Sequence, residues 1–117
     1  KSLSPIVGHV VVHADKRNFA SALITLDPDV APQWAAAEGI AGDYGELTND
    51  LNVRDHLQGR VDELNAGLSR WETIKQFRVL DHDFSVETGE LTPSQKVKRR
   101  VVENMYVEVL NGMYESS

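Results

Sequence analysis

The sequence predicts a small α+β domain in which a mostly antiparallel three-stranded sheet is packed by helices. Two runs rich in β-branched residues near the N-terminus indicate neighbouring strands. Later segments with apolar residues at every third or fourth position indicate helices, and a further short apolar run between them indicates a third strand. The chain of 117 residues is long enough for one domain. The order of two strands, helices, one strand and a final helix is typical of the α+β class.

The first two predicted strands cover residues 5–13 and 19–26. The polar connection at residues 14–18 makes an antiparallel hairpin the expected pairing. His9 and His13 lie four positions apart in the first strand, where that spacing separates two side chains by roughly 13 Å. We therefore interpret them as histidines on the same face of a strand, and we predict no metal site.

Two helices are predicted next. The first covers residues 30–38, with Trp34 as its apolar anchor, and the second covers residues 52–68, with Asn52 as its N-cap. Residues 40–50 between them are polar and contain glycine, which predicts a loop. The apolar face of the second helix is formed by Val53, Leu57, Val61, Leu64 and Leu68. The same face could suit a partner helix, but its spacing matches core packing better.

Residues 71–76 are predicted to form a helical turn, followed by the third strand at residues 77–80. Asp81, His82 and Asp83 come next and could be taken for metal ligands or a proton relay. Neighbouring residues on an extended chain point to opposite sides, so the three cannot all face one site. We predict a turn here.

The last predicted helix covers residues 97–114. Thr92 and Gln95 have the spacing of a capping box, with Pro93 at the first helical position, and Ser94 is a rival cap if the helix starts later. The predicted apolar face consists of Val97, Val101, Met105, Val109 or Leu110, and Met113.

Positive charge is concentrated at the beginning of this last helix. The chain has twelve Lys and Arg residues and a net charge of -6, and Lys96, Lys98, Arg99 and Arg100 lie within five positions of one another. A helix N-terminus disfavours cations, so local stability does not explain their placement. A helix start that carries several cations suits an anion. The alternative is that they form an ordinary solvated helix face.

Composition excludes several classes of function. A net charge of -6 with a single basic cluster argues against a nucleic-acid-binding protein. Without cysteine, the chain has no disulfide, thiol nucleophile or cysteine-ligated zinc. No apolar run approaches the ~20 residues of a membrane span, and no signal-peptide pattern is visible. We expect a soluble, cytoplasmic protein whose natural start lies upstream of Lys1.

The segment Gly89–Arg99 reads GELTPSQKVKR. It resembles the last signature of the long-chain fatty acid–CoA ligases (long-chain acyl-CoA synthetases) of the adenylate-forming AMP-binding superfamily. Residues 71–77, 84–88 and 5–27 are similar to the segments that precede this signature in the family. The resemblance covers nearly the whole chain but only the small C-terminal domain of such an enzyme. It implies that residues 1–117 form a single C-terminal lid domain, inactive alone, without the hinge and the N-terminal AMP-binding domain.

The resemblance also implies a reaction. In this family ATP and a fatty acid form an acyl-adenylate, and CoA then takes the acyl group while AMP leaves. Lys96 matches the catalytic lysine of the first step, in which a positioned ammonium can bridge the carboxylate and the α-phosphate as their negative charges meet. Gln95 stands where the commoner superfamily signature has glycine. Mg2+ would accompany ATP and be bound mainly by the N-terminal domain.

Basic residues near the third strand contact the phosphates of CoA in some relatives. By position Lys75 is the best match, followed by Arg78, Lys98 and Arg70. Two alternatives remain: an acyl-AMP ligase that loads a carrier protein, and a non-catalytic interaction domain whose basic helix binds an acidic partner or anionic lipid. The resemblance also leaves open a peripheral membrane association of the intact enzyme.

Overall fold

A three-stranded sheet forms the centre of the protein, whose structure is a computed structural model that describes residues 4–14, 19–68 and 73–115. Its strands are β1 (Val7–His13), β2 (Ala20–Leu26) and β3 (Ile74–Val79), in the order β1-β2-β3. β1 and β2 form the predicted antiparallel hairpin. All residues of β2 are buried, as expected for the central strand.

The third strand differs from the prediction in its start and its direction. β3 runs parallel to β2, so only one of the two strand pairs is antiparallel. The connection between them contains a helix of 15 residues, about 22 Å long, which returns the chain to the end of the sheet where β2 began. β3 begins at Ile74, so the helical turn predicted for residues 71–76 is wrong over 74–76. Residues 71–72 of that turn lie outside the described part of the chain.

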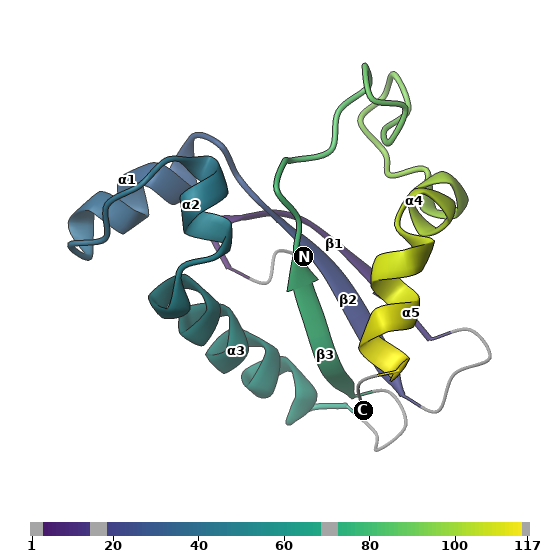
Figure 1. The fold of residues 1–117 in the computed structure, drawn as a ribbon, viewed down its shortest axis with the longest axis horizontal. Helices are drawn as coiled ribbons and strands as arrows, with labels where there is room; N and C mark the ends of the chain where they lie inside the picture. The colour runs from purple at the N-terminus through teal and green to yellow at the C-terminus, as the bar shows by residue number, and fades with distance from the viewer. Residues whose placement is uncertain (1–3, 15–18, 69–72, 116–117) are drawn as a thin grey trace.

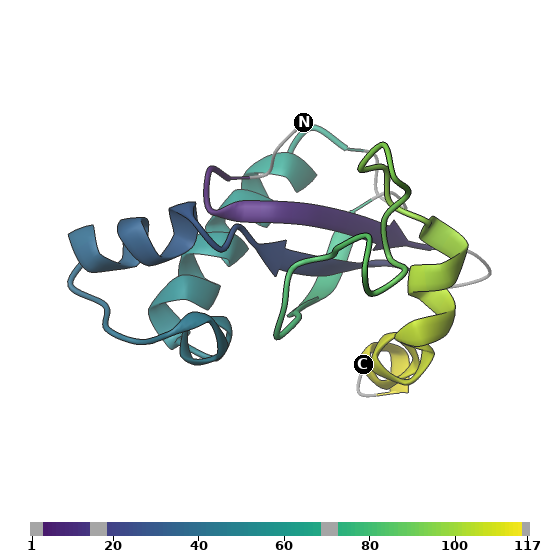
Figure 2. The same ribbon diagram turned by 90° about the horizontal axis from the view of Figure 1, so that it is seen from above.

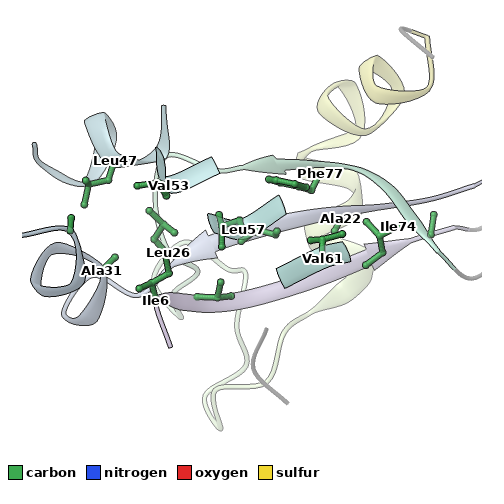
Figure 3. Close-up of a cluster of buried hydrophobic side chains, with 14 residues drawn as sticks. Ile6, Ala22, Leu26, Ala31, Leu47, Val53, Leu57, Val61, Ile74 and Phe77 are labelled. Atoms are coloured by element: carbon green, nitrogen blue, oxygen red, sulfur yellow. The ribbon is translucent and has the colours of Figure 1, made fainter. Parts of the chain in front are cut away.

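Helices α1 (Val30–Ala37), α2 (Tyr44–Thr48) and α3 (Leu51–Asn65) lie on one side of the sheet (Figure 1). Side chains from these helices and from the strands meet in one buried cluster (Figure 3). The cluster includes Ile6, Ala22, Leu26, Leu47, Val53, Leu57, Val61, Ile74 and Phe77. Leu64, part of the predicted apolar face of α3, is instead 44% exposed.

Short-range polar contacts set the starts of α2 and α3. The Asp43 carboxylate accepts a hydrogen bond from the Glu46 amide, and the Glu46 carboxylate accepts one from the Asp43 amide, which is a capping box. The loop predicted for residues 40–50 therefore contains a helix. The N-cap of α3 is Asp50 and not Asn52, because the Asp50 carboxylate accepts hydrogen bonds from the first amides of the helix.

Helices α4 (Arg99–Met105) and α5 (Val107–Glu115) lie on the other side, where the sequence predicted one continuous helix (Figures 1 and 2). The break falls at Tyr106. Val102 is the buried residue of α4, while Val101 and Met105, which were predicted to lie on the apolar face, are 39% and 49% exposed. On this side of the sheet lies a second buried apolar cluster, which consists of Val11, Leu23, Leu80, Phe84, Leu91, Val102, Leu110 and Met113.

In the described part of the chain, no helix has the length and hydropathy needed to cross a bilayer.

Candidate functional site

Lys96 lies in a tight turn, residues 91–97, which we call the Lys96 turn. Leu91 and Val97 pair as an isolated antiparallel bridge at its base. The Thr92 amide donates to the Lys96 carbonyl oxygen at 2.7 Å, and the Lys96 amide donates to Thr92 Oγ1 at 3.1 Å. The predicted capping role of Thr92 and Gln95 is therefore wrong: the Thr92 hydroxyl closes this turn, and the helix begins only at Arg99.

Gln95 has an unusual backbone conformation. Its φ angle is 70°, and it is the one non-glycine residue with positive φ among the described residues. This left-handed region is adopted readily by glycine and disfavoured for other residues. A glycine, which the commoner superfamily signature has at this place, would adopt this φ without strain. Here the same conformation is kept with a glutamine, so Gln95 does not disrupt the turn.

The basic residues that follow are exposed, but they differ in their contacts. Lys98 is the N-cap of α4, without a side-chain hydrogen bond to the helix. The Arg99 guanidinium donates to the Val12 carbonyl oxygen and lies 3.5 Å from Glu103 Oε2, which ties α4 to β1. The Lys96 ammonium has no ion pair with any residue that the structure describes.

A fully buried carboxylate, that of Glu90, lies directly before the Lys96 turn. Thr88 Oγ1 donates to Glu90 Oε1 at 2.5 Å, and the Tyr106 hydroxyl and His82 Nε2 donate to Oε2. We call these four residues the Glu90 network. Burial alone would raise the pKa of Glu90, but the three hydrogen bonds outweigh it and lower that pKa below its usual value.

His82 connects this network to a second carboxylate. Its Nδ1 lies 2.8 Å from Asp81 Oδ1, and its Nε2 lies 3.0 Å from Glu90 Oε2. An imidazolium satisfies both contacts because each of its ring nitrogens carries a proton. Partial burial lowers the pKa of His82, but the hydrogen bonds to Asp81 and Glu90 prevail and raise it. Burial and the contact with Glu90 also raise the pKa of Tyr106.

Asp83 ties the same loop to the sheet. Its Oδ1 accepts hydrogen bonds from His9 Nδ1 at 2.8 Å and from Thr25 Oγ1 at 2.6 Å. A Cβ atom on Gly8 would lie 2.7 Å from this oxygen, so glycine permits the close approach. As predicted, Asp81, His82 and Asp83 do not all face one site, although the neighbours Asp81 and His82 contact each other. His13 contacts a different carboxylate, because its Nδ1 lies 3.0 Å from Glu103 Oε2.

The residues predicted to contact CoA phosphates lie on two elements. Lys75 and Arg78 are on β3, whereas Lys98 precedes α4; Arg70 lies outside the described residues. Arg78 lines a surface groove of about 500 Å³ between β3 and α5. Asp81 and Glu108 line the same groove, and their negative charge offsets that of Arg78. Lys75 is exposed and does not line this groove.

The sequence did not single out Glu90, His82 or Tyr106 as a unit. Glu90 follows the turn residue Gly89, where a glutamate is usually solvated. Tyr106 is off the predicted apolar face of the last helix. In the described residues, no three side chains of the His, Asp or Glu type are grouped as metal ligands.

The sequence of this chain is similar to parts of several characterised proteins, although no family model matches it. It is 34% identical over 112 residues to the long-chain-fatty-acid–CoA ligase FadD15 of Mycobacterium tuberculosis, covering 94% of this chain and 19% of that protein. It is 34% identical over 112 residues to the peroxisomal long chain acyl-CoA synthetase 7 of Arabidopsis thaliana, covering 92% of this chain and 16% of the relative. The chain thus spans a fifth or less of the length of these curated relatives.

Solved structures share its fold. The A-PCP didomain of a carboxylic acid reductase from Segniliparus rugosus, in complex with AMP, superposes with a TM-score of 0.72 at 22% identity, over 97% of this chain and 14% of that one. The adenylation domain of a carboxylate reductase from Mycobacterium chelonae gives 0.70 at 22% identity, over 96% of this chain and 16% of that one. Over nearly its whole length, this chain is therefore similar in sequence to a part of these long-chain fatty acid–CoA ligases, the family that the Gly89–Arg99 signature resembles.

Proposed function

We propose that this chain is the C-terminal domain of a long-chain fatty acid–CoA ligase and that Lys96 is its catalytic residue for acyl-adenylate formation. The observation that carries the proposal is the placement of Lys96. Its side chain is exposed on a turn that backbone hydrogen bonds hold closed. No carboxylate among the described residues competes for its ammonium. The group is therefore free to enter a site on an adjacent AMP-binding domain.

The chemistry follows from the charges of the reactants. A fatty-acid carboxylate oxygen attacks the α-phosphorus of ATP, an O–P bond forms, and the bond to pyrophosphate breaks. The two reactants are anions, and a positioned ammonium lowers their repulsion and stabilises the charge that develops in the transition state. Lysine suits this role because it is a compact point charge on a flexible chain.

Separate assays of the two half-reactions, in the intact ligase that contains this domain, test the proposal. We expect Lys96→Ala to slow acyl-adenylate formation on the order of 100-fold or more, the size of effect seen when one transition-state donor is removed. Thioester formation from preformed adenylate should keep its rate. Arg60→Ala is the control, because it removes a partly exposed cation, paired with Glu63 of the same helix, from α3 on the other side of the sheet. Equal rates of adenylate formation for wild type and Lys96→Ala would refute the role of Lys96.

For the second half-reaction, we propose that Lys75, Arg78 and Lys98 contact CoA phosphates, as the family resemblance implies. Lys75 should contribute most, because Asp81 and Glu108 offset the charge of Arg78 in its groove. We expect Lys75→Ala to raise the KM for CoA while leaving adenylate formation unchanged. The KM effect should shrink at high salt, since exposed charge interactions are screened.

A carrier-protein thiol is the second candidate acceptor, favoured by one observation: the fold is shared with an A-PCP didomain. Offering the intact enzyme CoA and a phosphopantetheinylated carrier protein in parallel separates the two acceptors. Rapid acyl-CoA formation with no acyl-carrier product supports the CoA ligase. Acylation of the carrier alone would assign the domain to an acyl-AMP ligase.

A further inference from the structure

We propose that the buried Glu90 carboxylate is a positioning residue that holds the Lys96 turn in place for adenylate formation. This inference rests on the function proposed for Lys96. It assigns a role to a carboxylate that does not touch the reactants and that acts through the turn next to it. Two observations support the inference. Glu90 is buried, and it accepts hydrogen bonds from Tyr106 at the junction of α4 and α5 and from the Lys98 amide at the base of the turn.

Glu90 joins the base of the Lys96 turn to the junction between α4 and α5. Its carbonyl oxygen accepts a hydrogen bond from the Lys98 amide at 2.8 Å, next to the bridge between Leu91 and Val97. Its carboxylate accepts a hydrogen bond from the hydroxyl of Tyr106, the residue between α4 and α5. The Lys96 turn is therefore fixed at its base to the helix junction.

The base of the turn is also packed into the domain. Leu91 is 2% exposed and belongs to the apolar cluster that contains Val102 and Leu110. The part of the turn that carries Lys96 is exposed, and the Lys96 side chain forms no ion pair with a residue in the described part of the chain. The position of the ammonium thus depends on how firmly the base is held. Misplacement of a reacting group by about 1 Å can lower a rate about 100-fold.

The hydrogen bonds of the network favour a carboxylate at this position. Thr88, His82 and Tyr106 each direct a donor at Glu90, whose two ionised oxygens only accept. Glutamine has the same shape, but its amide nitrogen would replace one acceptor by two donors. The neutral amide lacks the negative charge that strengthens these hydrogen bonds, and the Thr88 or Tyr106 hydroxyl would have to turn to accept from its N–H, which weakens the hold on the turn base. A merely space-filling role would tolerate this exchange.

The first experiment measures both half-reactions in the intact ligase for Glu90→Gln and Tyr106→Phe. We expect Glu90→Gln to lower kcat for adenylate formation on the order of 10-fold, with thioester formation from preformed adenylate unchanged. Tyr106→Phe, which deletes one donor and keeps the ring, should act in the same direction with a smaller effect. Glu87→Gln is the matched control, because it makes the same chemical change at an exposed position in the same loop. If Glu90→Gln does not fold, the kcat of Tyr106→Phe for adenylate formation tests the inference by itself.

The second experiment asks whether Glu90 acts through Lys96. In a Lys96→Ala background there is no ammonium left to position, so we expect Glu90→Gln to cause no further loss of adenylate formation. An equal loss in both backgrounds would show that Glu90 only maintains the fold and would overturn the inference. Normal adenylate formation in Glu90→Gln and Tyr106→Phe, together with a large loss in Lys96→Ala, would also overturn it while leaving the proposed function intact. No loss in Lys96→Ala would refute the proposed function itself.

Discussion

Replacement of Gln95 by glycine should stabilise the protein. Gln95 has a φ of 70°, and an L-residue in the left-handed region is disfavoured by about 1–2 kcal/mol. Glycine removes this penalty but adds about 0.4–1 kcal/mol of conformational freedom to the unfolded chain. The difference is a net gain of about 0.5–1 kcal/mol in the free energy of unfolding. For a domain of this size, that gain corresponds to a rise in Tm of about 2–4 °C.

Urea denaturation of wild type, Gln95→Gly and Gln95→Ala measures the effect. Alanine is the matched control, since it removes the exposed side chain and keeps the Cβ atom that causes the strain. We expect Gln95→Ala to stay within about 0.5 kcal/mol of wild type. The reasoning is refuted if Gln95→Gly is no more stable than Gln95→Ala.

Three further predictions concern stability. Gly89 has a φ of 83°, and a Cβ atom added there would meet no atom within 4 Å. Gly89→Ala should therefore lower the free energy of unfolding, measured by urea denaturation, by about 1 kcal/mol through backbone strain alone. Leu57→Ala should cost about 2–5 kcal/mol because Leu57 is 0% exposed, whereas Leu64→Ala, at 44% exposure, should change stability by less than about 1 kcal/mol; similar losses for both would contradict the core assignment. The raised pKa of His82 contributes stability that is present below 6.5 and is lost as the pH rises through the pKa of the folded state. The lowered pKa of Glu90 contributes stability that is present above pH 4.5 and is lost as the pH falls through the pKa of the folded state. The difference in the free energy of unfolding between wild type and His82→Gln should therefore be largest between pH 4.5 and pH 6.5 and should decline on both sides of this range.

Short-range patterns predicted much of the fold. The hairpin and helices α1 and α3 follow from β-branched runs, a polar connection and helical periodicity, each contained in fewer than about twenty residues. Helix α2 was missed although its Asp43 and Glu46 have the capping-box spacing. The parallel pairing of β3 could not be read from its own residues, because it depends on the helices that return the chain across the sheet.

The same distinction applies to the site. Lys96 was singled out by a local signature, and the structure places it on an exposed turn, while its catalytic role stays a prediction. Thr92 and Gln95 matched a capping box in spacing, but tertiary contacts of Leu91 made the segment a turn instead. The Glu90 network joins residues up to 24 positions apart, such as His82 and Tyr106, so no window of local sequence contains its pattern.

The single-turnover rate of acyl-adenylate formation from ATP and fatty acid, measured for the intact ligase with lysine or alanine at position 96, tests the central claim most directly. The account predicts that the rate falls on the order of 100-fold without the ammonium, while acyl transfer from added adenylate to CoA proceeds at the wild-type rate. An unchanged rate of adenylate formation in Lys96→Ala would contradict it.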